Sequence, residues 1–398
     1  MPPSRKLSGT TLVHGDQGLT TDANVAPSIS VSTTFRAAPT APNQSRTLQD
    51  FDWRQPSHHV YSRWSQQITT RAEHVLSKIN HGFAITYASG LAAGLAALFH
   101  FQPKRIAIRG GYPGFFSIFE ILQRSNGSKP EIIDLDDPFQ PGDFCWLETP
   151  LNPTGESRDI AFYANKIHEV NGKLLVDSTF APPPLQYPFD LGADCVLHSG
   201  SKYFGGHSDL LCGVLIVQTE PEWKQLHLDR SFLGNMMGSL ESWLLLRSLR
   251  TLHLRVAQQS ATATALAQWL NAIVKTPHGH LIDNIPGGIV AHVSHSSIQG
   301  IDERGFDPHN QMIGGWNATF SLKMSTPKSA KQLPHLLKYF TPATSLGGVE
   351  SLIEYRHEID PSADPCLVRL SIGLEDFEDL KRDLSLAFQK LAQPRAKL

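Results

Sequence analysis

The chain has 398 residues, enough for a large domain and a smaller one, and 40 % of them are hydrophobic, which allows a buried core. Its formal net charge of −2 gives no reason to expect binding to nucleic acid or to an anionic membrane surface. No stretch approaches the roughly 20 apolar residues of a membrane-spanning helix. The basic residues between Met1 and Thr10 are not followed by the apolar run of a secretory signal. We therefore expect a soluble, cytoplasmic protein.

Four cysteines are present, and none forms a closely spaced pair; they are Cys145, Cys195, Cys212 and Cys366. Most lie in apolar segments, which favours buried free thiols in a reducing compartment. No cluster of histidines and cysteines has the spacing of a metal site, so we expect no bound metal.

Residues 1–66 are predicted to form an N-terminal arm. Within it, a polar stretch with prolines runs from Ala37 to His59 without clear periodicity. A segment of this length without regular structure is usually either disordered or wrapped on the surface of a partner.

From Gln67 onward, helical patterns alternate with short apolar runs. Helices are predicted at 70–80, 91–101 and 160–170, and strands at 84–87, 105–109, 131–135, 144–148, 173–177, 194–198 and 213–217. This alternation is typical of an α/β protein with a mostly parallel central sheet, in which ligands bind at the carboxyl ends of the strands. We assign this large domain to residues 67–260.

One long helix is predicted from Gly238 to Lys275, since that stretch has no proline and no internal glycine. Beyond it we expect a strand at 318–324, a helix at 330–339, strands near Leu352 and at 367–372, and a last helix at 377–391. This different order predicts a smaller C-terminal α+β domain, assigned to residues 261–398.

Polar residues follow three successive predicted strands. Glu148 and Asn152 follow the first, Asp177 ends the second, and a segment from His198 to Asp209 that contains Lys202 follows the third. A lysine that can be neutral, an acid, and hydroxyl groups near a helix N-terminus are what pyridoxal 5'-phosphate needs from a protein. The sequence therefore points to this cofactor.

The sequence resembles the Cys/Met-metabolism family of pyridoxal-phosphate enzymes, which includes cystathionine γ-synthase, cystathionine γ-lyase and the O-acylhomoserine sulfhydrylases. The resemblance extends over most of the chain in seven stretches: Val60-Tyr-Ser-Arg63, Ala88-Ser-Gly-Leu-Ala-Ala93, Glu148-Thr-Pro-Leu-Asn-Pro153, Val176-Asp-Ser-Thr-Phe180, His198 to Asp209, Ser345-Leu-Gly-Gly-Val-Glu-Ser351 and Val368-Arg-Leu-Ser-Ile-Gly-Leu-Glu-Asp376. It implies the aminotransferase-like fold (fold type I) and a homotetramer built from two catalytic dimers.

The resemblance also implies roles for single residues. Lys202 would hold the cofactor as a Schiff base and move protons between the substrate carbons and the cofactor. Asp177 would pair with the pyridine nitrogen, and Asn152 would lie near the phenolic oxygen. Tyr112 would stack on the ring and assist proton transfer. Thr179, in the same motif as Asp177, would also contact the cofactor.

Other matched residues are implied in binding the phosphate and the substrate. Phosphate would be bound by Gly90, Leu91, Ser199 and Ser201, and by Tyr61 and Arg63 of the arm of the neighbouring subunit. Arg369, Ser345 and Asn152 would bind the substrate, with the guanidinium on its carboxylate. We expect His207 to be structural, through a hydrogen bond at its glycine turn, although a catalytic role is the alternative.

The family's chemistry allows two outcomes after a group leaves Cγ of the amino acid. Another nucleophile is added there, or the unsaturated product is released. The chain departs from the usual family pattern at three places near this γ end: residues 64–70, Thr344 where an acidic residue is common, and the variant 353–357. The loss of an acid at Thr344 removes a partner for an ammonium group on the nucleophile.

The leading prediction is γ-replacement on an O-acyl-L-homoserine, with a thiol or a carbon atom as the nucleophile. The alternatives are a cystathionine γ-lyase or β-lyase and, in another class, a non-catalytic paralogue. The presence of both Lys202 and Asp177 argues against the last of these.

Overall fold

The computed structural model describes residues 7–19, 23–37, 51–126 and 130–393. Most of the aperiodic stretch from Ala37 to His59, and the first six residues of the segment from Met1 to Thr10, lie outside the described residues. Among the helices of the described ranges, none combines the length and apolar character needed to cross a membrane.

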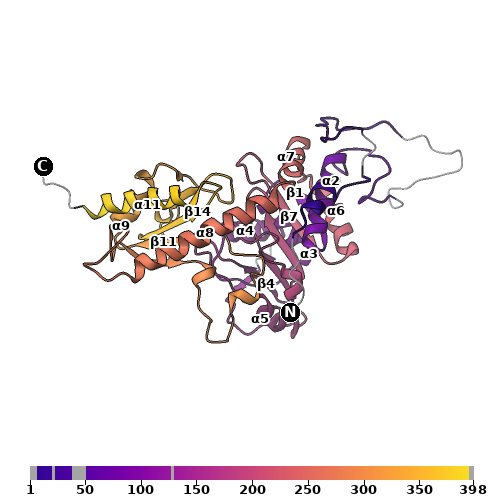
Figure 1. Ribbon diagram of the computed structural model, residues 1–398. Coiled ribbons are helices and arrows are strands. Elements are labelled where there is room, and N and C mark those ends of the chain that lie inside the picture. Colours follow the sequence, from indigo (N-terminus) through magenta and orange to yellow (C-terminus); the bar gives the residue numbers. More distant parts are fainter. Residues whose placement is uncertain (1–6, 20–22, 38–50, 127–129, 394–398) are drawn as a thin grey trace.

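The larger sheet has seven strands in the order β1-β7-β6-β5-β4-β2-β3 (Figure 1). Strands β2 to β6 are mutually parallel, as predicted, whereas β7 is antiparallel to both β1 and β6. The strands are β1 Phe83–Tyr87, β2 Arg105–Ala107, β3 Glu131–Ile133, β4 Phe144–Glu148, β5 Lys173–Asp177, β6 Cys195–Ser199 and β7 Gly213–Val217. The predicted α/β class with a mostly parallel central sheet is confirmed.

Helices cover both faces of this sheet because successive residues of its strands point to opposite sides. In β4, Phe144 and Trp146 belong to one buried hydrophobic cluster, whereas Cys145 and Leu147 belong to another. The first cluster packs under α3 Gly90–Phe101, α4 Gly114–Asn126 and α6 Glu220–Leu233. The second includes α1 Gly9–His14, α2 Gln67–Asn80, α5 Ile160–His168, α7 Ser239–Leu249 and α8 Leu252–Lys275.

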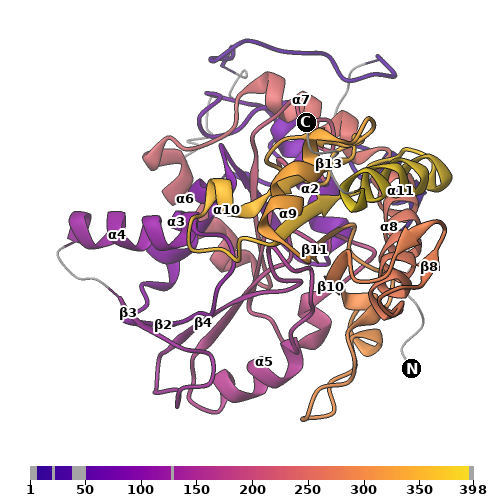
Figure 2. The ribbon, with the colours of Figure 1, turned by 90° about the vertical axis from the view of Figure 1, so that its left-hand side faces the viewer.

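The smaller C-terminal sheet has five strands in the order β10-β11-β14-β13-β12. Helix α8 extends from the large sheet toward it (Figure 1) and lies beside the last helix, α11 (Figure 2). The elements of this C-terminal part are β10 Val290–Ser294, β11 Thr319–Met324, α9 Pro327–Gln332, β12 Thr341–Pro342, β13 Leu352–Tyr355, α10 Arg356–Ile359, β14 Leu367–Ser371 and α11 Phe377–Ala392. They are preceded by the hairpin of β8 Leu281–Ile282 and β9 Ile285–Pro286.

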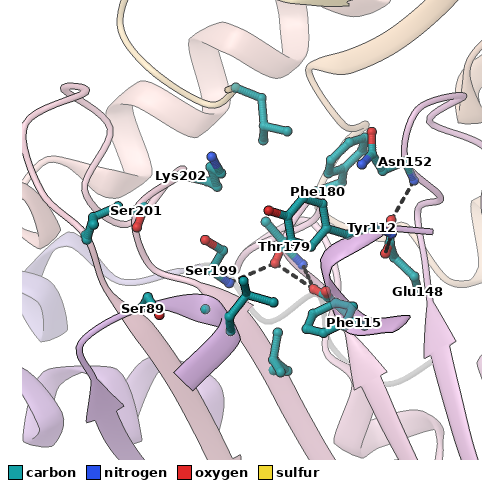
Figure 3. A pocket seen from close by; sticks show the side chains of 16 residues that line it. Ser89, Tyr112, Phe115, Glu148, Asn152, Thr179, Phe180, Ser199, Ser201 and Lys202 are labelled. Atoms are coloured by element: carbon teal, nitrogen blue, oxygen red, sulfur yellow. Dashed lines mark hydrogen bonds between the residues drawn. The ribbon is translucent and has the colours of Figure 1, made fainter. Parts of the chain in front are cut away.

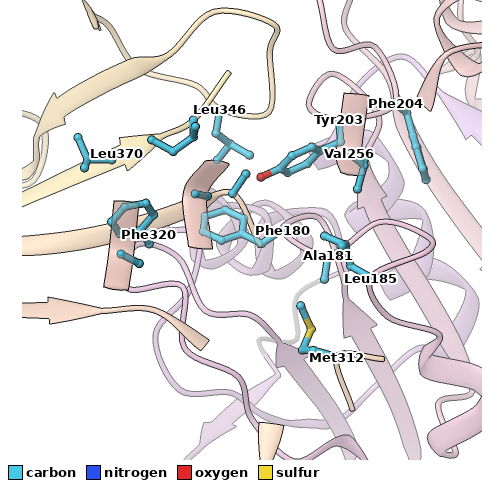
Figure 4. Packing of buried hydrophobic residues seen from close by; sticks show 14 of the residues in the cluster. Phe180, Ala181, Leu185, Tyr203, Phe204, Val256, Met312, Phe320, Leu346 and Leu370 are labelled. Atoms are coloured by element: carbon cyan, nitrogen blue, oxygen red, sulfur yellow. The ribbon is translucent and has the colours of Figure 1, made fainter. Parts of the chain in front are cut away.

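The two sheets share one hydrophobic core. Figure 4 shows Phe180 and Tyr203 of the large domain close to Phe320 and Leu346 of the C-terminal part. The hydroxyl groups of Tyr203 and Thr319 also lie 3.1 Å apart. This packing fixes the position of the smaller sheet relative to the strand ends of the larger one.

The prediction of one helix from Gly238 to Lys275 is wrong, because the chain breaks at Arg250 and Thr251 into α7 and α8. At the break, the carbonyl oxygen of Ser248 accepts a hydrogen bond of 2.9 Å from Nη2 of Arg255. This bond adds to those that the same carbonyl accepts from the N–H and the hydroxyl of Thr251 at the end of α7.

The predicted helix at 330–339 is also only partly correct. Helix α9 ends at Gln332 and is followed by a short 3-10 turn at Leu333–His335. Pro334 has no backbone N–H to continue the helix. The N–H groups of Lys338 and Tyr339 instead donate to the carboxylate of Asp383.

The described start of the arm is held to the large domain by a carboxylate shared between two arginines. Asp16 lies 2.6 Å from Arg71 of α2 and 2.9 Å from Arg250 at the end of α7. Burial alone would raise the pKa of Asp16, but the hydrogen bonds from both arginines bring it below its ordinary 3.8.

Replacing Asp16 by Asn should lower the free energy of unfolding by about 3 kcal/mol near neutral pH, because two arginines lose their carboxylate. The pKa of Asp16 is lowered in the folded state, so this contribution is present above pH 3.8 and is lost as the pH falls through the folded-state value. Urea unfolding at several pH values measures it. Asp379→Asn, on the exposed face of α11, is the control and should change little. Equal losses in both variants at neutral pH would contradict the assignment.

Candidate active site

Most of the predicted site residues meet at the carboxyl ends of the parallel strands. Glu148 at the end of β4 lies opposite Asp177 at the end of β5, and Ser199 ends the next strand, β6. Figure 3 shows a cavity with Ser89, Ser199, Ser201 and Lys202 on one side and with Tyr112, Phe115, Glu148 and Asn152 on the other. Its volume is about 250 Å³.

Asp177 is buried and is held by its neighbour in the same motif. One carboxylate oxygen accepts hydrogen bonds from the backbone N–H of Thr179 at 3.0 Å and from its hydroxyl at 2.6 Å. The Thr179 hydroxyl also accepts from the N–H of Ser199 at 2.8 Å, which ties the ends of β5 and β6 together. Burial raises the pKa of Asp177, and the bonds from Thr179 oppose this rise.

The N-terminus of α3 borders the other end of the cavity. The Ser89 hydroxyl caps the helix by accepting from the N–H of Ala92 at 3.1 Å. A Cβ on Gly90 would lie 3.1 Å from the hydroxyl oxygen of Ser199, so glycine permits this close approach. With Leu91 and Ser201 also lining the cavity, this corner brings together all four predicted phosphate-binding residues of the chain.

Lys202 enters the cavity from the loop after β6. Its Nζ donates to the hydroxyl of Ser345 at 2.9 Å. Burial lowers the pKa of Lys202, and the positive charge of Arg369 lowers it further while Glu354 opposes the shift. A lowered pKa favours the neutral amine that nucleophilic chemistry requires.

Glu148 is a site residue to which the sequence had assigned no role. One of its oxygens accepts from the N–H of Tyr112 and the other from the N–H of Asn152, each at 2.7 Å. A Cβ on Gly111 would lie 2.5 Å from this carboxylate, so glycine is required there. Burial and the nearby charge of Asp177 raise the pKa of Glu148. This single carboxylate fixes the loops that carry Tyr112 and Asn152.

Arg369 on β14 lines a second, larger groove beside Lys202 and is already paired within the protein. Its guanidinium donates to Oδ1 of Asn152 at 3.1 Å and to the carbonyl oxygen of Ser345 at 2.9 Å, and it lies 2.5 Å from the carboxylate of Glu354. Ser345 has a positive φ of 87°, uncommon for a residue with a Cβ. The three predicted substrate-binding residues therefore form one connected group.

A larger groove of about 850 Å³ opens beside Lys202 and runs between the loop 110–114 and the segment around α10. Thr344, Glu354 and Arg356 line it, as the departures from the family pattern suggested. Residues 64–70 do not line it in this chain. Trp64 instead stacks on Trp53 with ring centres 5.3 Å apart.

The two predicted phosphate ligands of the arm lie elsewhere in this chain. Arg63 donates to the carbonyl oxygen of Ser231 at 2.7 Å, and the Tyr61 side chain is exposed. His207 is bound to the carbonyl oxygen of its glycine turn, at Gly205, and to the hydroxyl of Ser248, which agrees with the structural reading. All four cysteines are free, and three are buried.

The model of the Cys/Met metabolism PLP-dependent enzyme family matches residues 9–389. The chain belongs to this family. It is 31 % identical to a cystathionine gamma-lyase of Dictyostelium discoideum over 98 % of this chain and 99 % of the relative. It is also 29 % identical to a cystathionine beta-lyase of Lactococcus lactis over 87 % of this chain and 93 % of the relative.

Solved structures of similar proteins share the fold. One is metB from Corynebacterium glutamicum, with a TM-score of 0.82, 25 % identity and coverage of 96 % of this chain and 98 % of that chain. Another is a methionine gamma lyase from Micromonospora echinospora, with a TM-score of 0.80, 30 % identity and the same coverages. The fold type I architecture predicted from the sequence is therefore confirmed.

The cofactor of this family is pyridoxal 5'-phosphate. The cavity fits it in three respects. A buried carboxylate, Asp177, has one oxygen engaged by Thr179 and can offer the other to the ring nitrogen. The close approach at Gly90 leaves a cradle at a helix N-terminus for the phosphate. Lys202 lies on the same side with its amine inside the cavity.

Replacing Glu148 by Gln should lower kcat for an amino-acid substrate by about 100-fold, the scale of effect that a small misplacement of reacting groups produces. Glutamine has one oxygen and one amide nitrogen, so one of the two N–H groups, from Tyr112 or Asn152, would face a donor. Steady-state kinetics measure this, with Glu378→Gln on the exposed face of α11 as the control. An unchanged kcat in the Glu148 variant would contradict the positioning role.

Proposed function

We propose that the protein catalyses γ-replacement on an O-acyl-L-homoserine. In this reaction the Cγ–O bond breaks, the acyl group leaves as a carboxylate, and a thiol or carbon nucleophile forms a bond to Cγ after losing its proton. The groove of about 850 Å³ beside Lys202 is the observation that supports this reading, since it leaves room for a second reactant next to the bound amino acid.

The residues of the smaller cavity are proposed to hold the cofactor and the amino acid. Bound pyridoxal phosphate supplies an electron sink for negative charge on the carbons next to the amino group. Lys202 holds the cofactor and, with its pKa lowered, moves protons at the substrate carbons. Asp177 pairs with the ring nitrogen, Tyr112 covers the ring, and Arg369 binds the α-carboxylate.

The γ end of the groove favours a nucleophile without an ammonium group. Thr344 is uncharged, and the two carboxylates that line the groove accept hydrogen bonds from protein groups. Glu354 pairs with Arg369 and Arg356, and Asp360 accepts from the N–H and the hydroxyl of Ser362. An ammonium group on the nucleophile would compete with these partners for a carboxylate.

The second candidate is elimination by a cystathionine lyase. It is supported by the names of relatives with about 30 % identity, which are cystathionine gamma-lyases and beta-lyases. The cavity residues serve replacement and elimination equally, because both begin with removal of the α-proton from a bound amino acid.

The assembly and the division into domains are part of the same proposal. We place the arm at 1–66, the cofactor domain at 67–260 and the C-terminal domain at 261–398. The exposed Tyr61 and the nearby Arg63 would reach the phosphate site of a neighbouring subunit in a homotetramer. We also propose that the protein is cytoplasmic.

The test supplies the cofactor-loaded protein with O-acetyl-L-homoserine, alone and together with sulfide, thiols, cysteine or β-keto acids, and identifies products by mass spectrometry. The proposal predicts an adduct at Cγ with a thiol or carbon nucleophile. Absence of an adduct with every nucleophile would contradict replacement. Release of ammonia from cystathionine alone would favour a lyase, a γ-lyase if 2-oxobutanoate accompanies it and a β-lyase if pyruvate does.

Lys202→Ala should remove turnover and the visible absorbance of the bound cofactor. Lys224→Ala is the matched control, because that side chain is exposed on α6. Equal turnover in the two variants would show that catalysis does not require Lys202.

A further inference from the structure

We propose that Arg356 forms a second carboxylate-binding site in the groove and recognises a carboxylate on the group that leaves or enters at Cγ. This inference rests on the proposed function and names the chemical class of that group. The side chain of Arg356 lines the same groove as Lys202 and Arg369, which places it within reach of a bound amino acid.

The position of Arg356 follows from the pairing of two strands. Glu354 on β13 lies directly opposite Arg369 on β14 in the antiparallel register. Arg356 comes two residues after Glu354, where the strand ends and α10 begins. The chain turns there, so the guanidinium of Arg356 remains on the groove side and close to Glu354.

Two guanidinium groups share one carboxylate oxygen in this arrangement. Oε2 of Glu354 lies 3.0 Å from Nη1 of Arg356 and 2.5 Å from Nη2 of Arg369. All three side chains are more than nine-tenths buried. One carboxylate therefore pairs with two guanidinium groups in a buried region, where an uncompensated charge is energetically unfavourable.

Arg356 has donors left over for a ligand. Within the described ranges, Glu354 is its recorded partner, and its buried Nε has no hydrogen-bond partner. By contrast, Arg369 also donates to Asn152 and to Ser345. A planar guanidinium with free donors matches the two oxygens of a carboxylate.

The opposite wall of the groove adds no charge of its own. It consists of Gly110 to Gly114 and Phe116. The remaining carboxylate at the groove, Asp360, accepts from the N–H and hydroxyl of Ser362. An anionic group that enters along this wall meets no acid on the wall itself, and it shares Arg356 with Glu354 and with the nearby charge of Asp360.

The two arginines set the shape of the ligand. Because both contact the same oxygen, their guanidinium groups lie within a few ångströms of each other. A short amino acid with a carboxylate at each end can place one on Arg369 and the other on Arg356. The group at Cγ thus carries its carboxylate close to Cγ, as an oxo acid does when its carboxylate lies next to the carbon that bonds to Cγ.

The experiment compares two amino acids that have no leaving group on Cγ. L-2-Aminoadipate and L-norleucine have the same chain length and differ in a terminal carboxylate or methyl group. Calorimetric titration of the cofactor-loaded protein should show about tenfold or tighter binding of L-2-aminoadipate, the gain expected from a charge-assisted hydrogen bond.

Arg356→Gln should remove this preference and leave L-norleucine binding within about threefold of the wild type, because Glu354 keeps its pairing with Arg369. Arg356→Lys keeps the positive charge but loses the planar pair of N–H donors. This variant should retain part of the preference for L-2-aminoadipate. Arg382→Gln is the matched control, since that arginine is exposed on α11, and it should behave as the wild type.

An unchanged preference in Arg356→Gln, or no preference in the wild type, would overturn the proposal. Neither ligand can undergo loss of a group from Cγ, so these outcomes leave the choice between replacement and elimination untouched. Failure of the wild type to bind either amino acid would overturn the proposal together with the amino-acid site itself.

Discussion

One carboxylate, that of Glu354, holds together the substrate side of the pocket by pairing with two buried arginines. Removal of Glu354 would leave two guanidinium groups without a counter-charge, a strongly unfavourable state in a buried place. Its pairing also determines what remains available to a ligand. Arg369 is oriented toward Asn152 and Ser345, whereas Arg356 keeps free donors along the groove. The charge balance at the γ end therefore depends on a residue outside the lining of the cofactor cavity.

The cofactor cavity and the groove are joined through Asn152. Its backbone N–H is held by Glu148 at the end of β4, and its side-chain oxygen accepts from Arg369 on β14. The large sheet and the smaller sheet are thereby coupled at the place where an amino acid would lie. Lys202 is part of the same connection through the hydroxyl of Ser345. The packing of the two sheets into one core keeps these distances fixed.

The sequence brought out residues that the structure gathers in one cavity, because the signals for them are local. Lys202 and Asp177 lie in short motifs at strand ends, and the structure brings them into one cavity. The break at Arg250 could not be predicted, since the contacts found there, such as that of Arg255 with the carbonyl oxygen of Ser248, are side-chain contacts that periodicity does not encode. The pairing of Glu354 with Arg369 was missed for a similar reason. It follows from the register of two strands separated by a loop, whereas the sequence showed only an unusual segment.

The most direct test of this account is a crystal structure of the cofactor-loaded protein with L-2-aminoadipate bound. The account predicts that the α-carboxylate lies within hydrogen-bonding distance of Arg369 and that the terminal carboxylate reaches the guanidinium of Arg356. A ligand with its terminal carboxylate directed away from Arg356, or with Glu354 turned out of the groove and both arginines on the α-carboxylate, would contradict it.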